Sequence, residues 1–272
     1  MPSSRLAFVV FVPAIALVGC MPPGDAEEQI ATASAASALQ SSRNAGSANG
    51  MTKGLQTARG QGACVTPEAV AAACAAEPTV DVFPVGCAKK TADGDALHVE
   101  YDDCTGPFGD VHVMGGADAT FSKGSRCDEV EATIHDSGDL TANGAKVTYA
   151  AIAGIAVEDD SADVKWAASW SARTSAGDAT GSDDLTLQQD LSSFCVDATG
   201  TSEAELDGWQ FHSTLSGFAV CPNACPSAGT LAVTATDDKW QGTITLTFDG
   251  SSKAHVVGTR GQKFDIDLVC GD

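Results

Sequence analysis

The chain has 272 residues and a formal net charge of −21, with 36 acidic side chains against 15 basic ones. This excess of negative charge argues against binding to nucleic acid or to anionic lipid headgroups, because both depend on Lys and Arg. Ten cysteines in a chain of this length favour an oxidising compartment, where disulfides persist.

The first nineteen residues have the pattern of an export signal. One positive charge, Arg5, precedes an apolar run from Leu6 to Val18 that only Pro13 interrupts. A helix needs about 20 apolar residues to span a bilayer, so this run predicts the hydrophobic region of a signal peptide, residues 1–19.

The last two residues of this run and the two that follow it are Leu17-Val18-Gly19-Cys20, which resembles the lipobox of bacterial lipoproteins. The resemblance implies cleavage before Cys20, thioether diacylation of this cysteine, palmitate included, and attachment to a membrane through the lipid. Met21 follows instead of Asp, which in such lipoproteins favours the outer membrane over the inner one. The alternative is an ordinary signal peptide that is cleaved elsewhere, with Cys20 an incidental thiol.

Residues 20–62 consist largely of Ala, Ser, Gly, Gln and Asn. Such a segment buries too little apolar surface to offset its ordering entropy, so we expect the lipidated Cys20 to be followed by a disordered tether. A weak helix from Ala26 to Leu39 is the alternative. Residues 63–272 are expected to form the folded domain.

One helix is predicted near the start of that domain. Thr66 is a suitable N-cap, Pro67 suits the first helical position, and Glu68 favours the positive end of the helix dipole. Several alanines follow, and Pro78 is expected to end the helix.

From about Val80 onward, apolar and polar residues alternate with a period of two, which indicates strands with one buried and one wet face. Turn signals such as Asp93-Gly94, Asn143-Gly144 and Asp249-Gly250 recur between these runs. The sequence therefore predicts twelve to fourteen strands in an all-β fold, an antiparallel β-sandwich or open curved barrel with one short N-terminal helix. The apolar positions of four such runs are Leu97, Val99 and Tyr101; Val130, Ala132 and Ile134; Ile244, Leu246 and Phe248; and Phe264, Ile266 and Leu268.

Disulfides are expected to brace this domain. With Cys20 lipidated, nine cysteines remain, and four disulfides with one thiol left over is the simplest arrangement. Pairs that close short loops, Cys64 with Cys74 and Cys87 with Cys104, are favoured, the first across the ends of the predicted helix. The nine candidates are Cys64, Cys74, Cys87, Cys104, Cys127, Cys195, Cys221, Cys225 and Cys270.

No motif nominates an enzyme. The chain contains no Gly-x-Ser-x-Gly nucleophile motif, and its acidic residues are too numerous for one carboxylate pair to stand out. We expect no catalytic residue, cofactor or metal. The alternative of a zinc site would combine Cys221, Cys225 and His212, although disulfides are favoured for these cysteines.

Other polar and aromatic groups have a functional and a structural interpretation. His98, His112 and His135 lie on polar strand faces and could be neighbours across a sheet. Trp166 with Trp170, and Trp209 with Phe211, share strand faces, either as stacking platforms for sugars or, as we expect, in the core. Acidic loop clusters suit either calcium or, as we expect, solvent: Asp93/Asp95, Asp102/Asp103/Asp110, Asp159/Asp160/Asp163, Asp183/Asp184 and Asp237/Asp238.

The expected function is that of an outer-envelope lipoprotein, a non-enzymatic structural or binding module. The β region resembles uncharacterised Cys-containing envelope lipoproteins, through Gly-Thr-Ile-Thr-Leu-Thr-Phe-Asp-Gly at residues 242–250 and the terminal Leu268-Val269-Cys270. This resemblance implies no activity. The alternatives are a carrier of lipid or another apolar ligand in a half-barrel, and a secreted hydrolase. The ligand or protein partner is not indicated.

Overall fold

A computed structural model describes residues 31, 64–76, 84, 86–105, 112–158, 160–174, 177–193, 195–206, 208–221, 224–238, 241–268 and 270. The predicted signal peptide, Cys20, Pro78, Asp110 and Asp159 lie outside the described residues. So does the predicted tether, residues 20–62, apart from Ala31. Ala31 has a helical backbone and is fully buried within the hydrophobic core. The other residues of the alternative helix from Ala26 to Leu39 lie outside the described residues.

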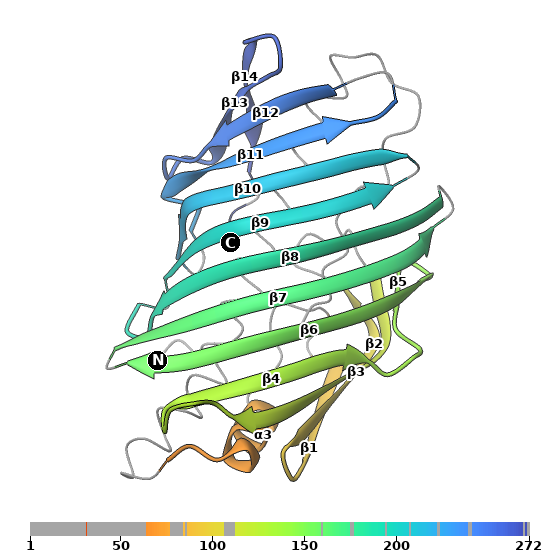
Figure 1. Cartoon of the computed structure of the whole chain (residues 1–272), viewed down its shortest axis with the longest axis vertical. Coiled ribbons are helices and arrows are strands. Elements are labelled where there is room, and N and C mark those ends of the chain that lie inside the picture. Colours follow the sequence, from red (N-terminus) through yellow and green to blue (C-terminus); the bar gives the residue numbers. More distant parts are fainter. Residues whose placement is uncertain are drawn as a thin grey trace.

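The strands form one continuous antiparallel sheet. Each main strand pairs with its neighbours along the chain in the order β1-β2-β3-β4-β6 and on to β14, while the short β5 pairs with β3 and β6. Figure 1 shows this sheet as a twisted layer whose first strands turn away from the plane of the central ones. The elements are α3 (Pro67–Ala76), β1 (Ala88–Asp93), β2 (Ala96–Thr105), β3 (His112–Lys123), β4 (Glu129–Asp136), β5 (Thr141–Ala142), β6 (Ala145–Glu158), β7 (Ser161–Thr174), β8 (Gly177–Asp190), β9 (Val196–Leu206), β10 (Trp209–Val220), β11 (Ala228–Thr236), β12 (Gln241–Thr247), β13 (Lys253–Val257) and β14 (Lys263–Asp267).

Alternation along the strands decides which side chains enter the core. In β2, Leu97, Val99 and Tyr101 are buried, and the residues between them are exposed. The same pattern holds in β4, which buries Val130 and Ile134. Successive strand residues point to opposite faces, so the apolar set gathers on one inner face. The predicted all-β fold with one short helix is confirmed.

Asn-Gly makes a tight turn where the sequence predicts one. Asn143 and Gly144, between β5 and β6, both have positive φ angles, 49° and 74°. A two-residue hairpin turn of type I′ requires positive φ at both positions, and Asn and Gly reach it at low cost. This turn sends the chain from the short β5 into the long β6.

Helix α3 begins and docks as its sequence indicates. Pro67 is its first residue, and the Thr66 side chain accepts a hydrogen bond from the Ala69 backbone N–H at 3.3 Å. Val70 and Cys74 are among its buried residues, and the helix contacts β1, β2 and β3. No helix in the described part of the chain is long and apolar enough to cross a membrane.

Four disulfides brace the sheet, as the cysteine count predicts. The predicted pair Cys87–Cys104 forms, next to the cross-strand pair Ala88 and Tyr101 of β1 and β2. Another joins the open ends of β9 and β10, next to the cross-strand pair of Val196 and Val220. The four disulfides are Cys64–Cys127, Cys87–Cys104, Cys195–Cys221 and Cys225–Cys270.

The predicted pairing of Cys64 with Cys74 is wrong. Cys64 pairs with Cys127, which ties the start of α3 to the loop between β3 and β4. Cys74 lies in the last turn of the ten-residue helix, with its thiol buried and in none of the four disulfides. Disulfide-bonded Cα atoms lie within about 7 Å, whereas a helix of this length spans about 15 Å, so a bridge between its ends does not form.

The predicted aromatic row on β7 belongs to the core. Trp170 is buried, and Trp166 packs partly buried against the same core. The indole of Trp170 lies over Gly181 on the neighbouring strand, where an added Cβ would overlap the ring. Gly181 is therefore needed for space, and the aromatic side chains fill the inner face.

Candidate functional site

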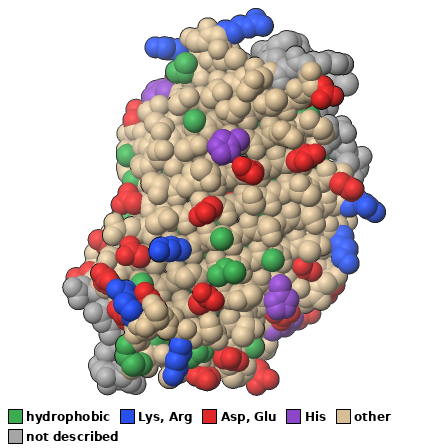
Figure 2. Space-filling view, viewed as in Figure 1, with side chains coloured by type: hydrophobic (Ala, Val, Ile, Leu, Met, Phe, Trp, Pro, Cys, Tyr) green, Lys and Arg blue, Asp and Glu red, His purple; other side chains and the backbone are tan. Residues whose placement is uncertain are grey.

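The outer face of the central strands is built from small and hydroxylated side chains. Alternation leaves Ser169 and Ser171 of β7, Thr180 of β8 and Thr201 of β9 pointing away from the core. Figure 2 shows a face dominated by uncharged polar groups and backbone, with scattered acidic, basic, histidine and hydrophobic side chains. This outer face is a broad polar surface on a stiff sheet.

A shallow cavity of about 500 Å³ opens on the outer face across β8, β9, β10 and β11, and we refer to it as the outer hollow. Its side chains stand in two cross-strand rows, because partners in register lie side by side on the same face. The first row is Ser182, Glu203, His212 and Thr234, and the second is Thr180, Glu205, Gln210 and Thr236.

The floor of the outer hollow is backbone. Gly181, Ala204 and Phe211 also line it, yet each alternates with residues of the two rows. The side chains of Ala204 and Phe211 therefore point to the inner face, Gly181 has no side chain, and the main chain of all three reaches the cavity. The floor of the cavity is therefore main chain, and the polar side chains of the two rows stand around it.

Negative charge dominates the outer hollow. Glu203 and Glu205 are two residues apart on β9 and point to the same side. The Glu203 Oε1 atom lies 3.6 Å from His212 Nδ1, and both side chains are more than half exposed. None of the described residues that line the cavity is a lysine or an arginine. The arrangement offers carboxylates, hydroxyls and a carboxamide to a polar ligand.

Two of the three predicted strand histidines do meet across the sheet. His98 Nδ1 lies 2.7 Å from Asp118 Oδ1, and His135 Nε2 lies 4.0 Å from the other oxygen of the same carboxylate. His112 lies apart from them and contacts Asp103 at 2.9 Å. Asp118 therefore links β2, β3 and β4 on the outer face.

Ser137 lies close to this histidine cluster without joining it. A Cβ added at Gly116 would meet both Ser137 Oγ and the ring carbon Cε1 of His98. The hydroxyl of Ser137 instead donates to Asp139 Oδ1 at 2.9 Å, and this oxygen also accepts from the Gly116 N–H. These two hydrogen bonds hold the pKa of Asp139 below its usual value. The arrangement braces the turn between β4 and β5.

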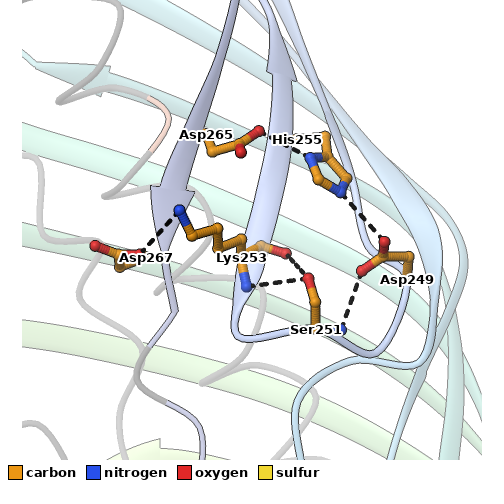
Figure 3. Close-up of polar contacts among 6 residues, drawn as sticks. All are labelled: Asp249, Ser251, Lys253, His255, Asp265 and Asp267. Atoms are coloured by element: carbon orange, nitrogen blue, oxygen red, sulfur yellow. Dashed lines mark hydrogen bonds and ion pairs between the residues drawn. The ribbon is translucent and has the colours of Figure 1, made fainter.

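The fifth histidine braces the C-terminal edge of the sheet (Figure 3). His255 Nδ1 lies 2.8 Å from Asp265 Oδ1 on β14, and its Nε2 lies 3.2 Å from Asp249 Oδ2 in the turn before β13. Asp265 first, and then Asp249, raise the pKa of His255. Hydrogen bonds from Ser251 and from His255 lower the pKa of Asp249 to about 2. This brace is strongest when His255 is protonated, and it weakens as the pH rises through the raised pKa.

One carboxylate, that of Asp183, lies on the buried inner face of the sheet. Asp183 points to the inner face, where only 8% of it is exposed. Burial raises the pKa of its carboxyl to about 6, although a hydrogen bond with Ser202 offsets part of the effect. Asp183 also raises the pKa of the buried Tyr149, where desolvation is the main cause. A charged group in this core destabilises the fold at neutral pH.

Two of the alternatives for metal binding are contradicted by the structure. Cys221 and Cys225 belong to two different disulfides, so neither sulfur is available to zinc with His212. Asp183 and Asp184 point to opposite faces of β8 and cannot share a calcium ion. Within the described part of the chain, no three His, Cys, Asp or Glu side chains are placed to hold a metal ion.

The sequence held an unused signal for the outer hollow. Asp207-Gly208 between two alternating runs is a two-residue hairpin signal, and counting outward from it pairs Glu205 with Gln210 and Glu203 with His212. The structure has this register. The burial of Asp183 could also be predicted from the sequence. It is two residues before Leu185, so both side chains point to the same face of the strand, and Leu185 is buried.

Comparison of the chain with protein-family models, curated proteins and solved structures found no match.

Replacing Asp183 by Asn should stabilise the protein at neutral pH. The folded chain holds this proton up to a pH of about 6, and the unfolded chain up to about 4, so the free energy of unfolding falls as the pH rises between these values. Two pKa units correspond to about 3 kcal/mol, which is the upper limit of the gain at pH 7.5. Urea unfolding at pH 4 and at pH 7.5 measures it. Parallel pH dependence in both proteins would contradict the burial of this charge.

Proposed function

We propose that the chain is a lipid-anchored protein of the bacterial outer envelope whose β domain is a non-enzymatic binding module. The lipobox at Leu17-Val18-Gly19-Cys20 supports the anchor, and four disulfides support a location outside the cytoplasm. The outer hollow is the binding site in this proposal.

The observation that carries the proposal is a cavity of about 500 Å³ built on rigid strands. Its volume falls in the range of small-molecule sites, about 300–1,000 Å³, and sites on strands hold their side chains more firmly than sites on loops. Its lining is polar, so a polar ligand suits it better than the lipid that a carrier would hold. A continuous sheet also resists deformation when a ligand binds.

The lipid anchor depends on one cysteine in this proposal. Replacing Cys20 by Ser should abolish incorporation of labelled palmitate and move the protein from the membrane fraction to the soluble fraction, because the thiol that carries the lipid in this proposal is gone. Replacing the buried Cys74 by Ser is the matched control and should leave the label in place. Persistent labelling of the Cys20 variant would contradict the anchor.

Blocking the outer hollow tests the binding module. Ser182→Trp places a large side chain inside the cavity, whereas Ser169→Trp places it at the neighbouring position of the same cross-strand row, outside the lining. Native mass spectrometry of the full chain, purified gently from the envelope, should show a bound small molecule in the wild type and in the Ser169 variant. The Ser182 variant should lose it. A bare mass in all three proteins, or the same adduct in all three, would contradict the proposal.

A further inference from the structure

The charged groups of the outer hollow favour a cation as its ligand. Glu203 and Glu205 are its charged groups, and no lysine or arginine occurs among the described lining residues. Only His212, 3.6 Å from Glu203, can add positive charge, and only when protonated. An anionic ligand such as a phosphate or a sugar acid would meet uncompensated carboxylates, so the cavity excludes it.

The rest of the lining offers both donors and acceptors of hydrogen bonds to a ligand. Hydroxyls and the Gln210 carboxamide surround the two carboxylates, and the one aromatic lining residue, Phe211, turns its ring to the inner face. A neutral sugar would therefore lack a stacking surface, and an acyl chain would lack apolar contacts. A hydrophilic cation that carries several N–H groups matches this lining.

The spacing of the carboxylates distinguishes among cations. Glu203 and Glu205 are two residues apart on an antiparallel strand, so their Cα atoms lie about 7 Å apart. A hard metal ion such as Ca²⁺ takes about six to eight oxygen ligands, and among the described residues no group of three or more His, Cys, Asp or Glu side chains is placed to hold one. A linear polyamine carries ammonium groups separated by a few methylene carbons, which is the scale of this span.

We propose that the outer hollow binds a linear polyamine, with one ammonium group on Glu203 and the next on Glu205. His212 stands across from Glu203 in register, and Gln210 stands across from Glu205, so both carboxylates have a polar neighbour on β10. The ligand lies along β9, and its remaining N–H groups meet the hydroxyls of the neighbouring strands. This inference rests on the proposed function, because it names the ligand of the same site.

Isothermal titration of the full chain in detergent with spermidine, at about 0.15 M salt, tests the proposal. This ionic strength screens the general attraction between a polycation and a chain of charge −21. Spermidine should bind the wild type at least about tenfold more tightly than 1-aminobutane, which carries a single ammonium group. This ratio corresponds to about 1.4 kcal/mol.

Matched double variants locate the site. Glu203→Gln with Glu205→Gln should weaken spermidine at least about tenfold, because it removes both carboxylates and keeps their size. Asp184→Asn with Asp197→Asn removes the same charge from the outer face of β8 and β9 outside the cavity, and it should change the affinity less than about twofold. Circular dichroism checks that both variants are folded.

Several results would overturn the polyamine assignment. Equal weakening by the two double variants would show attraction to overall charge only, and equal affinities for spermidine and 1-aminobutane would remove the role of the spacing. If spermidine fails to bind while Ser182→Trp still removes a co-purifying molecule, the binding module stands and its ligand is of another class. If spermidine fails to bind and no molecule co-purifies, both proposals fail.

Discussion

The register of the β-sheet is the constraint on which both faces of this protein depend. A slip of one residue between two strands would move a whole apolar set to solvent and a polar set into the core. The disulfide Cys195–Cys221 stands directly beside the paired residues Val196 and Val220 of β9 and β10. It covalently fixes the register of these two strands, which carry the charged residues of the outer hollow. The disulfide Cys87–Cys104 ties the residue before β1 to β2.

The alternation of residues along each strand gives the two faces of the sheet different side chains. Inward positions take large side chains, such as Trp170, and glycine where the ring needs room, as at Gly181. Outward positions take serine, threonine and charged residues, whose cross-strand contacts include Thr234 with Thr243 at 2.9 Å. Asp183 is an exception, because its carboxyl lies on the inner face. Its raised pKa reflects the free energy lost when the charged carboxylate is buried. The histidine and carboxylate pairs of the outer face join neighbouring strands as well.

Local sequence patterns predict the strands of this protein, but they do not predict which distant cysteines or strands come together. The alternation of Leu97, Val99 and Tyr101 predicts β2 correctly because burial follows from parity within one strand. Cys64 was assigned to Cys74 because short loops close easily, but its partner is Cys127, which packing brings to the start of α3. The outer hollow was missed for the same reason, since it needs the register of four strands at once. Only the hairpin signal at residues 207–208 pointed to part of it.

Cross-linking across β9 and β10 tests the account most directly, because the outer hollow exists only if Thr201 stands opposite Thr214. The pair Thr201→Cys with Thr214→Cys should oxidise to an additional disulfide, which peptide mapping by mass spectrometry detects without disturbance of the four native ones. The pair Thr201→Cys with Ser213→Cys places the two thiols on opposite faces and should stay reduced. A cross-link in the second pair and none in the first would show a register shifted by one residue, and Glu203 would then no longer stand opposite His212.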